Sequence, residues 1–123
     1  MRATSPRPTI LLVDDDAALR VALKFSLELE GFAVETFESG EALLLRGVPA
    51  GPTCLVLDYK LGGIDGLETL RQLRARGFDT PAVIVTGHLN PAVRQAIATA
   101  GATIVDKPLM GDALVGEIRA ALA

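Results

Sequence analysis

The sequence has little cysteine, no tryptophan and no long apolar run. Its single cysteine, Cys54, excludes an internal disulfide and a cysteine-rich zinc site. Apolar runs such as Ile10–Val13 and Ala42–Leu45 are four residues long, whereas a membrane-spanning helix needs about 20. Residues 1–8 lack the apolar segment of a secretory signal. These absences exclude membrane-spanning and disulfide-stapled classes, and we expect a cytoplasmic protein without a membrane partner.

The charge is also small, with 12 basic and 15 acidic residues and a net charge of −3. This balance offers no basic surface for nucleic acid, so we expect no direct nucleic-acid binding. Half of the 123 residues are apolar and only 4% are aromatic. A core of Ala, Val, Leu and Ile is typical of helices packed on parallel strands. We predict one domain over residues 9–123, preceded by a flexible arm over residues 1–8.

Short apolar runs alternate with helical patterns five times. We expect strands over residues 9–13, 33–36, 54–57, 81–85 and 103–105, and helices over about 17–30, 39–46, 66–76, 91–100 and 112–122. This alternation predicts an α/β fold whose parallel sheet carries helices on both faces. In such a sheet the ligand site lies beyond the carboxyl ends of the strands.

Polar residues follow four of the five predicted strands: Asp14 and Asp15, Asp58, Thr86, and Lys107. Three carboxylates meeting at one sheet edge repel each other unless a cation neutralises them. We therefore predict a Mg²⁺ (or Mn²⁺) site, because these hard ions prefer oxygen ligands. Lys107 and Thr86 could bind an oxyanion there, which suits phosphoryl transfer, and an Asp carboxylate can itself form an aspartyl phosphate.

Five segments in this order resemble the receiver domain of two-component response regulators. They are ILLVDDD (10–16), LELEGFAVETFESGEALL (27–44), CLVLDYKLGGIDGLETL (54–70), AVIVTGH (82–88) and the pair Lys107–Pro108. The resemblance implies a flavodoxin-like (βα)₅ three-layer sandwich with strand order 2-1-3-4-5. It also implies a switch rather than an enzyme, with self-phosphorylation and autodephosphorylation as its only chemistry.

The resemblance assigns a role to each strand-end residue. Asp58 is the implied phosphoacceptor, and Asp14, Asp15, Asp58 and the backbone carbonyl of Lys60 are the implied metal ligands. Thr86 and Lys107 are implied to bind the phosphoryl group. The Lys107–Pro108 bond is implied to be cis, a rare geometry.

Other positions are implied to tune or transmit the switch. Gly87 is the small residue that leaves the acceptor accessible, and Lys60 and His88 hold positions that tune dephosphorylation. The sequence departs from the family at Ile104, where a switch aromatic is usual. It also departs at Leu61–Gly63, where glycine replaces the usual proline and predicts a looser loop.

The implied partners are a sensor histidine kinase or phosphotransfer protein, and a downstream protein that reads the surface of the fourth helix, fifth strand and last helix. The same surface allows a homodimer. Because the pattern occupies residues 9–122, we expect the output within this sequence to be a surface presented to another protein.

Two other functions stay open at this stage. One is a degenerate receiver that binds a partner without phosphorylation; the other is an aspartate-based phosphohydrolase using Asp14-x-Asp16. Asp16 also suits a helix cap. His88 is interpreted as a lone exposed loop histidine and Cys54 as a small buried hydrophobe. A solvated helix face is expected for three arginines, Arg71, Arg74 and Arg76.

Overall fold

The computed structural model describes residues 7–87, 89–107, 109 and 112–123. His88 and the Lys107–Pro108 bond, both singled out in the sequence, therefore involve positions outside the described residues, as do residues 1–6 of the expected arm. Pro8, the last residue of that arm, is described. Its carbonyl accepts a hydrogen bond from the Ala33 backbone N–H at 2.9 Å, which ties the start of the domain to the second strand.

Five strands alternate with five helices, as the sequence predicts. The strands are β1 (Thr9–Val13), β2 (Ala33–Phe37), β3 (Thr53–Asp58), β4 (Ala82–Thr86) and β5 (Ala102–Asp106). The helices are α1 (Ala17–Leu29), α2 (Gly40–Arg46), α3 (Gly66–Ala75), α4 (Pro91–Thr99) and α5 (Ala113–Leu122). In the described part of the chain, no helix has the length and apolar character that crossing a membrane requires.

The strands form one parallel sheet in the order β2-β1-β3-β4-β5, which confirms the predicted topology. The register places Val13 beside Leu57, and Asp58 beside Val85. Asp14 therefore follows β1 at the level where β3 ends in Asp58. The chain crosses over between β1 and β3, so this edge is the topological switch point at which such sheets bind ligands.

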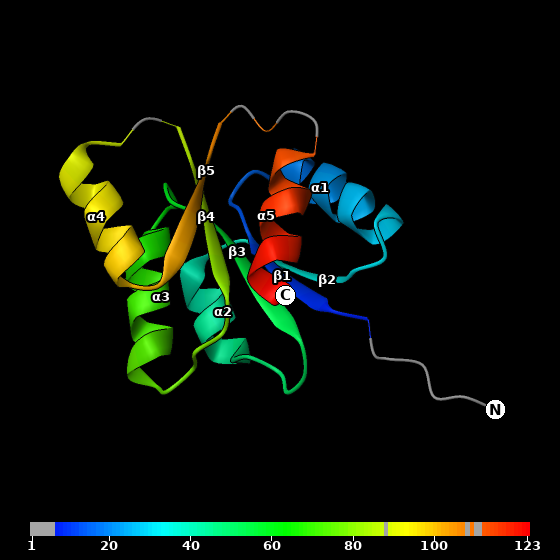
Figure 1. The fold of residues 1–123 in the computed structure, drawn as a ribbon, viewed down its shortest axis with the longest axis horizontal. Helices are drawn as coiled ribbons and strands as arrows, with labels where there is room; N and C mark the ends of the chain where they lie inside the picture. Colours follow the sequence, from blue (N-terminus) through cyan, green and yellow to red (C-terminus); the bar gives the residue numbers. More distant parts are fainter. Residues whose placement is uncertain (1–6, 88, 108, 110–111) are drawn as a thin grey trace.

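Two separate apolar cores pack on the two faces of the sheet. Along β1, Ile10 and Leu12 belong to one core and Leu11 and Val13 to the other, as alternation along a strand requires. Helices α1 and α5 cover the first face, and α2, α3 and α4 cover the second (Figure 1). Because both faces are covered, each central strand is a continuous apolar run.

Side-chain caps explain where four of the helices begin. The carboxylates of Asp16 and Asp65 accept hydrogen bonds from the N–H groups of Leu19 and Glu68, at 3.2 and 2.7 Å. The Asn90 side chain caps α4 in the same way, accepting from the Val93 N–H at 2.9 Å. Ser39 caps α2 in extended backbone, so α2 begins one residue later than the sequence indicates. Asp112 precedes α5 without a capping hydrogen bond, and the prediction that it belongs to this helix is off by one residue.

Candidate functional site

Three carboxylates meet at the carboxyl edge of the sheet, the upper edge in Figure 1. Asp14, Asp15 and Asp58 each offer a carboxylate oxygen, and these atoms all lie within 4.8 Å of one another. Asp14 and Asp58 are buried, whereas Asp15 is exposed. The sheet register produces this meeting, because β1 and β3 are neighbours and end at the same level.

The turn after β1 is held by its own hydrogen bonds. The Asp14 carboxylate accepts from the Asp16 backbone N–H at 2.9 Å, and the Arg20 guanidinium donates to the Asp14 carbonyl at 2.6 Å. These contacts fix the Asp14 side chain next to Asp58. The carboxylate of Asp16 is instead engaged in capping α1. The phosphohydrolase hypothesis needs Asp16 as an acid next to Asp14, and this capping role gives it no support.

Asp58 has two chemically different carboxylate oxygens. Its Oδ2 accepts from the Lys107 ammonium at 3.2 Å, while its Oδ1 is buried without a hydrogen-bond partner among the described residues. Burial raises the pKa of the Asp58 carboxyl above its ordinary value, and the nearby Asp14 carboxylate adds to this increase. The Lys107 ammonium lowers the same pKa, with a smaller contribution from the Lys60 backbone amide.

A cleft of about 380 Å³ opens above Asp58. Its lining residues are Asp58, Tyr59, Lys60, Thr86, Gly87, Leu89 and Lys107. The backbone N–H of Lys107 donates to the Thr86 carbonyl at 2.6 Å, which joins the ends of β4 and β5. The structure thus brings Asp58, Thr86 and Lys107 into one cleft, and Asp14 and Asp15 lie beside Asp58. It adds Tyr59 and Leu89, whose only sequence signals are their places after Asp58 and before the Asn90 helix cap.

Gly66, which the sequence reasoning missed, supports Asp58 from behind. A Cβ atom at Gly66 would lie 2.5 Å from the backbone oxygen of Asp58, closer than packed atoms allow. The Gly66 N–H also donates to the Tyr59 carbonyl at 2.9 Å. Only glycine lets the start of α3 approach β3 this closely. The available signal was a glycine at the first position of a helix, directly after its cap Asp65.

The loop over Leu61–Gly63, predicted to be loose, has an anchor from α2. The Glu41 carboxylate accepts from the Ile64 backbone N–H at 3.2 Å. Gly63 adopts a φ of +79°, which a proline cannot reach because its ring fixes φ near −65°. Gly62, which takes the place of the usual proline directly after Leu61, does not have a positive φ, so the left-handed backbone lies one residue further along the loop.

The residues expected to tune the switch lie in different settings. Lys60 and Gly87 are exposed at the cleft, and a Cβ atom at Gly87 would meet no heavy atom within 4 Å. Ile104 is half-buried in β5 and packs against the core under α2, α3 and α4. At the position where the family usually has a switch aromatic, this chain therefore has a packed aliphatic side chain.

Two expectations about other residues can be compared directly with the structure. Cys54 is fully buried, and burial raises the pKa of its thiol to about 12. The expectation of a solvated face is wrong for Arg74. Its guanidinium donates to the carbonyls of Ala100 and Thr80, at 3.0 and 2.7 Å. Unsatisfied carbonyls where α4 ends and before β4 draw the cation inward.

The donor set fits a hard divalent cation. A buried carboxylate oxygen without a donor is costly, and two further carboxylates lie within 4.8 Å of that carboxyl group. All three contribute oxygen, the ligand that Mg²⁺ prefers, and two or three carboxylates leave room for water ligands.

Comparison with known proteins agrees with this geometry. A family model described as the response regulator receiver domain matches residues 10–119. The chain is 38% identical over 112 residues to the transcriptional regulatory protein FixJ of Azorhizobium caulinodans, covering 90% of this chain and 53% of FixJ. It is also 38% identical over 114 residues to the C4-dicarboxylate transport transcriptional regulatory protein DctD of Pseudomonas aeruginosa, covering 92% of this chain and 25% of DctD. The chain thus spans between a quarter and about half of these relatives.

Solved structures show the same similarity. The structure of FixJ-N superposes with a TM-score of 0.85 at 30% identity, covering 94% of each chain. A structure of histidine kinase ThkA in complex with response regulator protein TrrA contains a chain that matches with a TM-score of 0.81 at 28% identity, covering 94% of this chain and 99% of that one. The matched segment contains every residue of the acidic cleft, and the chain belongs to the response regulator receiver domain family, the signalling switches of two-component systems.

Proposed function

We propose that this receiver takes a phosphoryl group onto Asp58 from a phosphohistidine of a partner protein. One Asp58 carboxylate oxygen forms the new bond to phosphorus while the bond from phosphorus to the histidine nitrogen breaks. The histidine leaves as imidazole, with the electron pair of the broken bond on its nitrogen. The observation that carries the proposal is Asp58 itself, a buried acid under a cleft with a lysine on one oxygen and two carboxylates nearby.

The cation proposed for this chemistry is Mg²⁺ or Mn²⁺, held by Asp14, Asp15, Asp58 and the backbone carbonyl of Lys60. When bound, it would neutralise charge on the acids and on the phosphoryl oxygens. Asp14 is fixed for this role by the Asp16 N–H and by Arg20. Asp15 is exposed and leaves the cation reachable from solvent.

Thr86 and Lys107 are proposed to bind the phosphoryl oxygens after transfer. The Thr86 hydroxyl can donate one hydrogen bond, and the Lys107 ammonium can exchange its contact with Asp58 Oδ2 for one with a phosphoryl oxygen. Both residues line the same cleft. Gly87, Lys60 and His88 are proposed to set access and phosphate lifetime, as the family resemblance implies.

The proposed output is a change in the α4-β5-α5 surface. Thr86 and Lys107 are joined through their backbones, and Arg94 of α4 forms an ion pair with Asp106 of β5 at 2.5 Å. A shift of Thr86 toward a phosphoryl group would therefore pull on β5 and on α4 together. Because Ile104 is aliphatic, we propose that the signal travels through this backbone link and ion pair, without the rotation of an aromatic ring. A downstream protein or a second copy of the chain would read it.

The proposed phosphodonor is a sensor histidine kinase or a phosphotransfer protein. An apolar stripe on α1 supports docking of such a protein beside the site, since α1 begins directly after the acidic turn. Val21, Phe25 and Leu29 follow one another at intervals of one helical turn, and they are 71%, 66% and 71% exposed. Contiguous exposed apolar side chains of this kind mark protein interaction surfaces.

Labelling with acetyl phosphate tests the acceptor directly. We expect Mg²⁺-dependent incorporation of one phosphoryl group in the wild-type chain and none in Asp58→Asn, measured by intact-mass spectrometry. Full labelling of Asp58→Asn would refute the assignment. Equal labelling of the wild-type chain with and without Mg²⁺ would refute the proposed cation. Partner binding that is identical with and without a phosphoryl mimic would instead favour a phosphorylation-independent receiver.

A further inference from the structure

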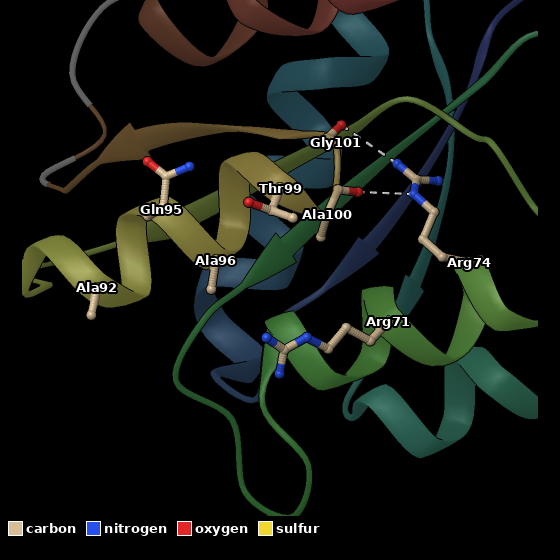
Figure 2. Close-up of a pocket in the computed structure, with 8 residues that line it drawn as sticks. All are labelled: Arg71, Arg74, Ala92, Gln95, Ala96, Thr99, Ala100 and Gly101. Atoms are coloured by element: carbon tan, nitrogen blue, oxygen red, sulfur yellow. Dashed lines mark hydrogen bonds between the residues drawn. The ribbon is translucent and has the colours of Figure 1, made fainter.

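A groove between α3 and α4 lies away from the acidic cleft. It has a volume of about 790 Å³ and shares no residue with the acidic cleft. Its lining residues are Arg71, Arg74, Ala92, Gln95, Ala96, Thr99, Ala100 and Gly101 (Figure 2). One wall is therefore α3 with two arginines, and the other is α4 with small or uncharged side chains.

The two arginines in this wall differ in their hydrogen bonds. Arg74 is engaged by backbone carbonyls, and Figure 2 shows its guanidinium turned toward Ala100 and Gly101. Arg71 is exposed and makes no hydrogen bond or ion pair with any described residue. Its side chain extends from α3 toward the space beneath α4 (Figure 2). Arg71 thus offers five N–H donors at the groove with no internal acceptor.

The groove is positively charged in a chain whose net charge is −3. None of its lining residues is acidic, so nothing in the wall neutralises Arg71. Gln95 and Thr99 on the opposite wall are exposed and provide neutral hydrogen-bonding groups. The charge complement of this wall is a carboxylate, which a guanidinium can bind through two parallel hydrogen bonds.

The size and lining of the groove favour a protein segment over a small anion. Alanine side chains at residues 92, 96 and 100 occur at four-residue intervals and leave the α4 wall shallow. A bound phosphate ion would contact the arginine and leave this apolar wall uncovered. A helix with an apolar stripe would cover it, as in other complexes in which a helix lies in a groove.

We propose that the α3–α4 groove binds a helical segment of a partner protein that presents an Asp or Glu to Arg71 and small apolar side chains to α4. This groove shares α4 with the proposed α4-β5-α5 output face but has α3 as its second wall, and it is formed without a phosphoryl group on Asp58. Arg71 is exposed, as expected for a solvated helix face, and the proposal adds a partner carboxylate to that side chain.

A displayed library of random peptides of about 12 residues, the length of an average helix, provides the probe. Selection against the full chain should enrich peptides that share an acidic position. In ¹⁵N-labelled protein, the enriched peptides should shift the amide signals of Arg71, Gln95 and Thr99. Replacing the peptide acid by its amide should weaken binding about tenfold, the effect of losing one charge-assisted contact.

Arg71→Glu should weaken the same peptides about tenfold or more, and a peptide with Lys at the acidic position should regain affinity for this variant. Arg76→Glu is the matched control. Arg76 caps the end of α3 and donates to the Leu44 carbonyl on the α2 side, so its replacement should leave binding nearly unchanged. Circular dichroism verifies that both variants fold.

Four results would overturn the proposal: no enriched peptide, enriched peptides without an acid, signal shifts outside the groove, or unchanged binding to Arg71→Glu. Titration with inorganic phosphate tests the other possible ligand, a small anion. Phosphate-induced shifts at Arg71 without any enriched peptide would assign the groove to a small anion and contradict a protein partner.

Discussion

Lys107 Nζ lies 3.2 Å from Asp58 Oδ2 across 49 residues of sequence, and it is the cation that faces this carboxylate. The Asp58 side chain is 7% exposed and that of Lys107 is 37% exposed. The acid is therefore shielded from water while its partner remains partly hydrated. Lysine suits this arrangement because its compact ammonium on a flexible stem can move from the carboxylate to a nearby oxyanion.

Lys107→Ala should strongly reduce labelling by acetyl phosphate, by about tenfold or more, because one charged contact to the incoming group is lost. Lys24→Ala is the control, since Lys24 forms its ion pair with Glu28 on α1 and lies outside the cleft. Initial labelling rates at fixed Mg²⁺ measure the effect. Equal rates for Lys107→Ala and the wild type would remove Lys107 from the phosphoryl site.

Adding Mg²⁺ should raise the thermal unfolding temperature, because an ion that binds only the folded state stabilises it. At a free concentration ten times the dissociation constant, the gain is about 1.4 kcal/mol. Asp15→Asn should lose most of this gain. The neighbouring variant Asp16→Asn should keep it, because Asp16 caps α1 and Asn caps equally well. A Mg²⁺ response that is the same in both variants would argue against the proposed ligands.

Gly66→Ala should destabilise the fold by about 1–3 kcal/mol, since the new methyl group must displace the backbone at Asp58. It should also slow labelling, because that displacement moves the acceptor. Gly62→Ala, in the loop that precedes α3, is the control, as a Cβ atom there meets no heavy atom within 4 Å. Urea unfolding and labelling rates test both effects. The steric argument fails if the two variants behave alike.

The sequence was sufficient for the architecture because local and global signals agree along this chain. Apolar runs end in polar residues, and caps such as Ser39, Asp65 and Asn90 precede the helices they start. Parallel topology then places the strand ends at one edge, which is why Asp14 and Asp58 could be paired without coordinates. The specific roles of these acids came from resemblance to the receiver family.

What the sequence did not reveal depends on distances between segments. Nothing local to Gly66 indicates that its neighbour is a carbonyl of β3. Arg74 has the same sequence context as the exposed Arg71, one helical turn earlier, yet it is drawn inward by carbonyls near Ala100 and Thr80. Such contacts arise from how α3, α4 and the connection to β4 approach one another, which periodicity does not encode.

Gly116→Ala should stabilise the protein by about 0.5–1 kcal/mol, because Gly116 is an exposed interior residue of α5 with open space at its Cβ position. Gly31→Ala should instead destabilise the protein. Its surroundings are equally open, but its φ is +96°, so the substitution should cost about 1 kcal/mol or more. Denaturant midpoints of the two variants should move in opposite directions; a shift in the same direction would contradict the backbone argument.

Cys54 should make the fold less stable at high pH. Burial raises the pKa of its thiol from 9.0 to about 12, so the folded chain keeps the proton over a range in which the unfolded chain releases it. The stabilisation is complete below the unfolded pKa and is lost as pH rises toward 12, by up to about 1.4 kcal/mol per pH unit. Cys54→Ala lacks this proton, although its smaller side chain lowers stability at every pH.

Urea unfolding of the wild type and Cys54→Ala between pH 8 and about pH 10.5, where only the unfolded thiol ionises, measures the effect. The free energies of unfolding of the two proteins should converge as pH rises. A constant difference between the two free energies of unfolding would mean that Cys54 titrates equally in the folded and unfolded states. The thiol would then not be shielded by β3 and its neighbours.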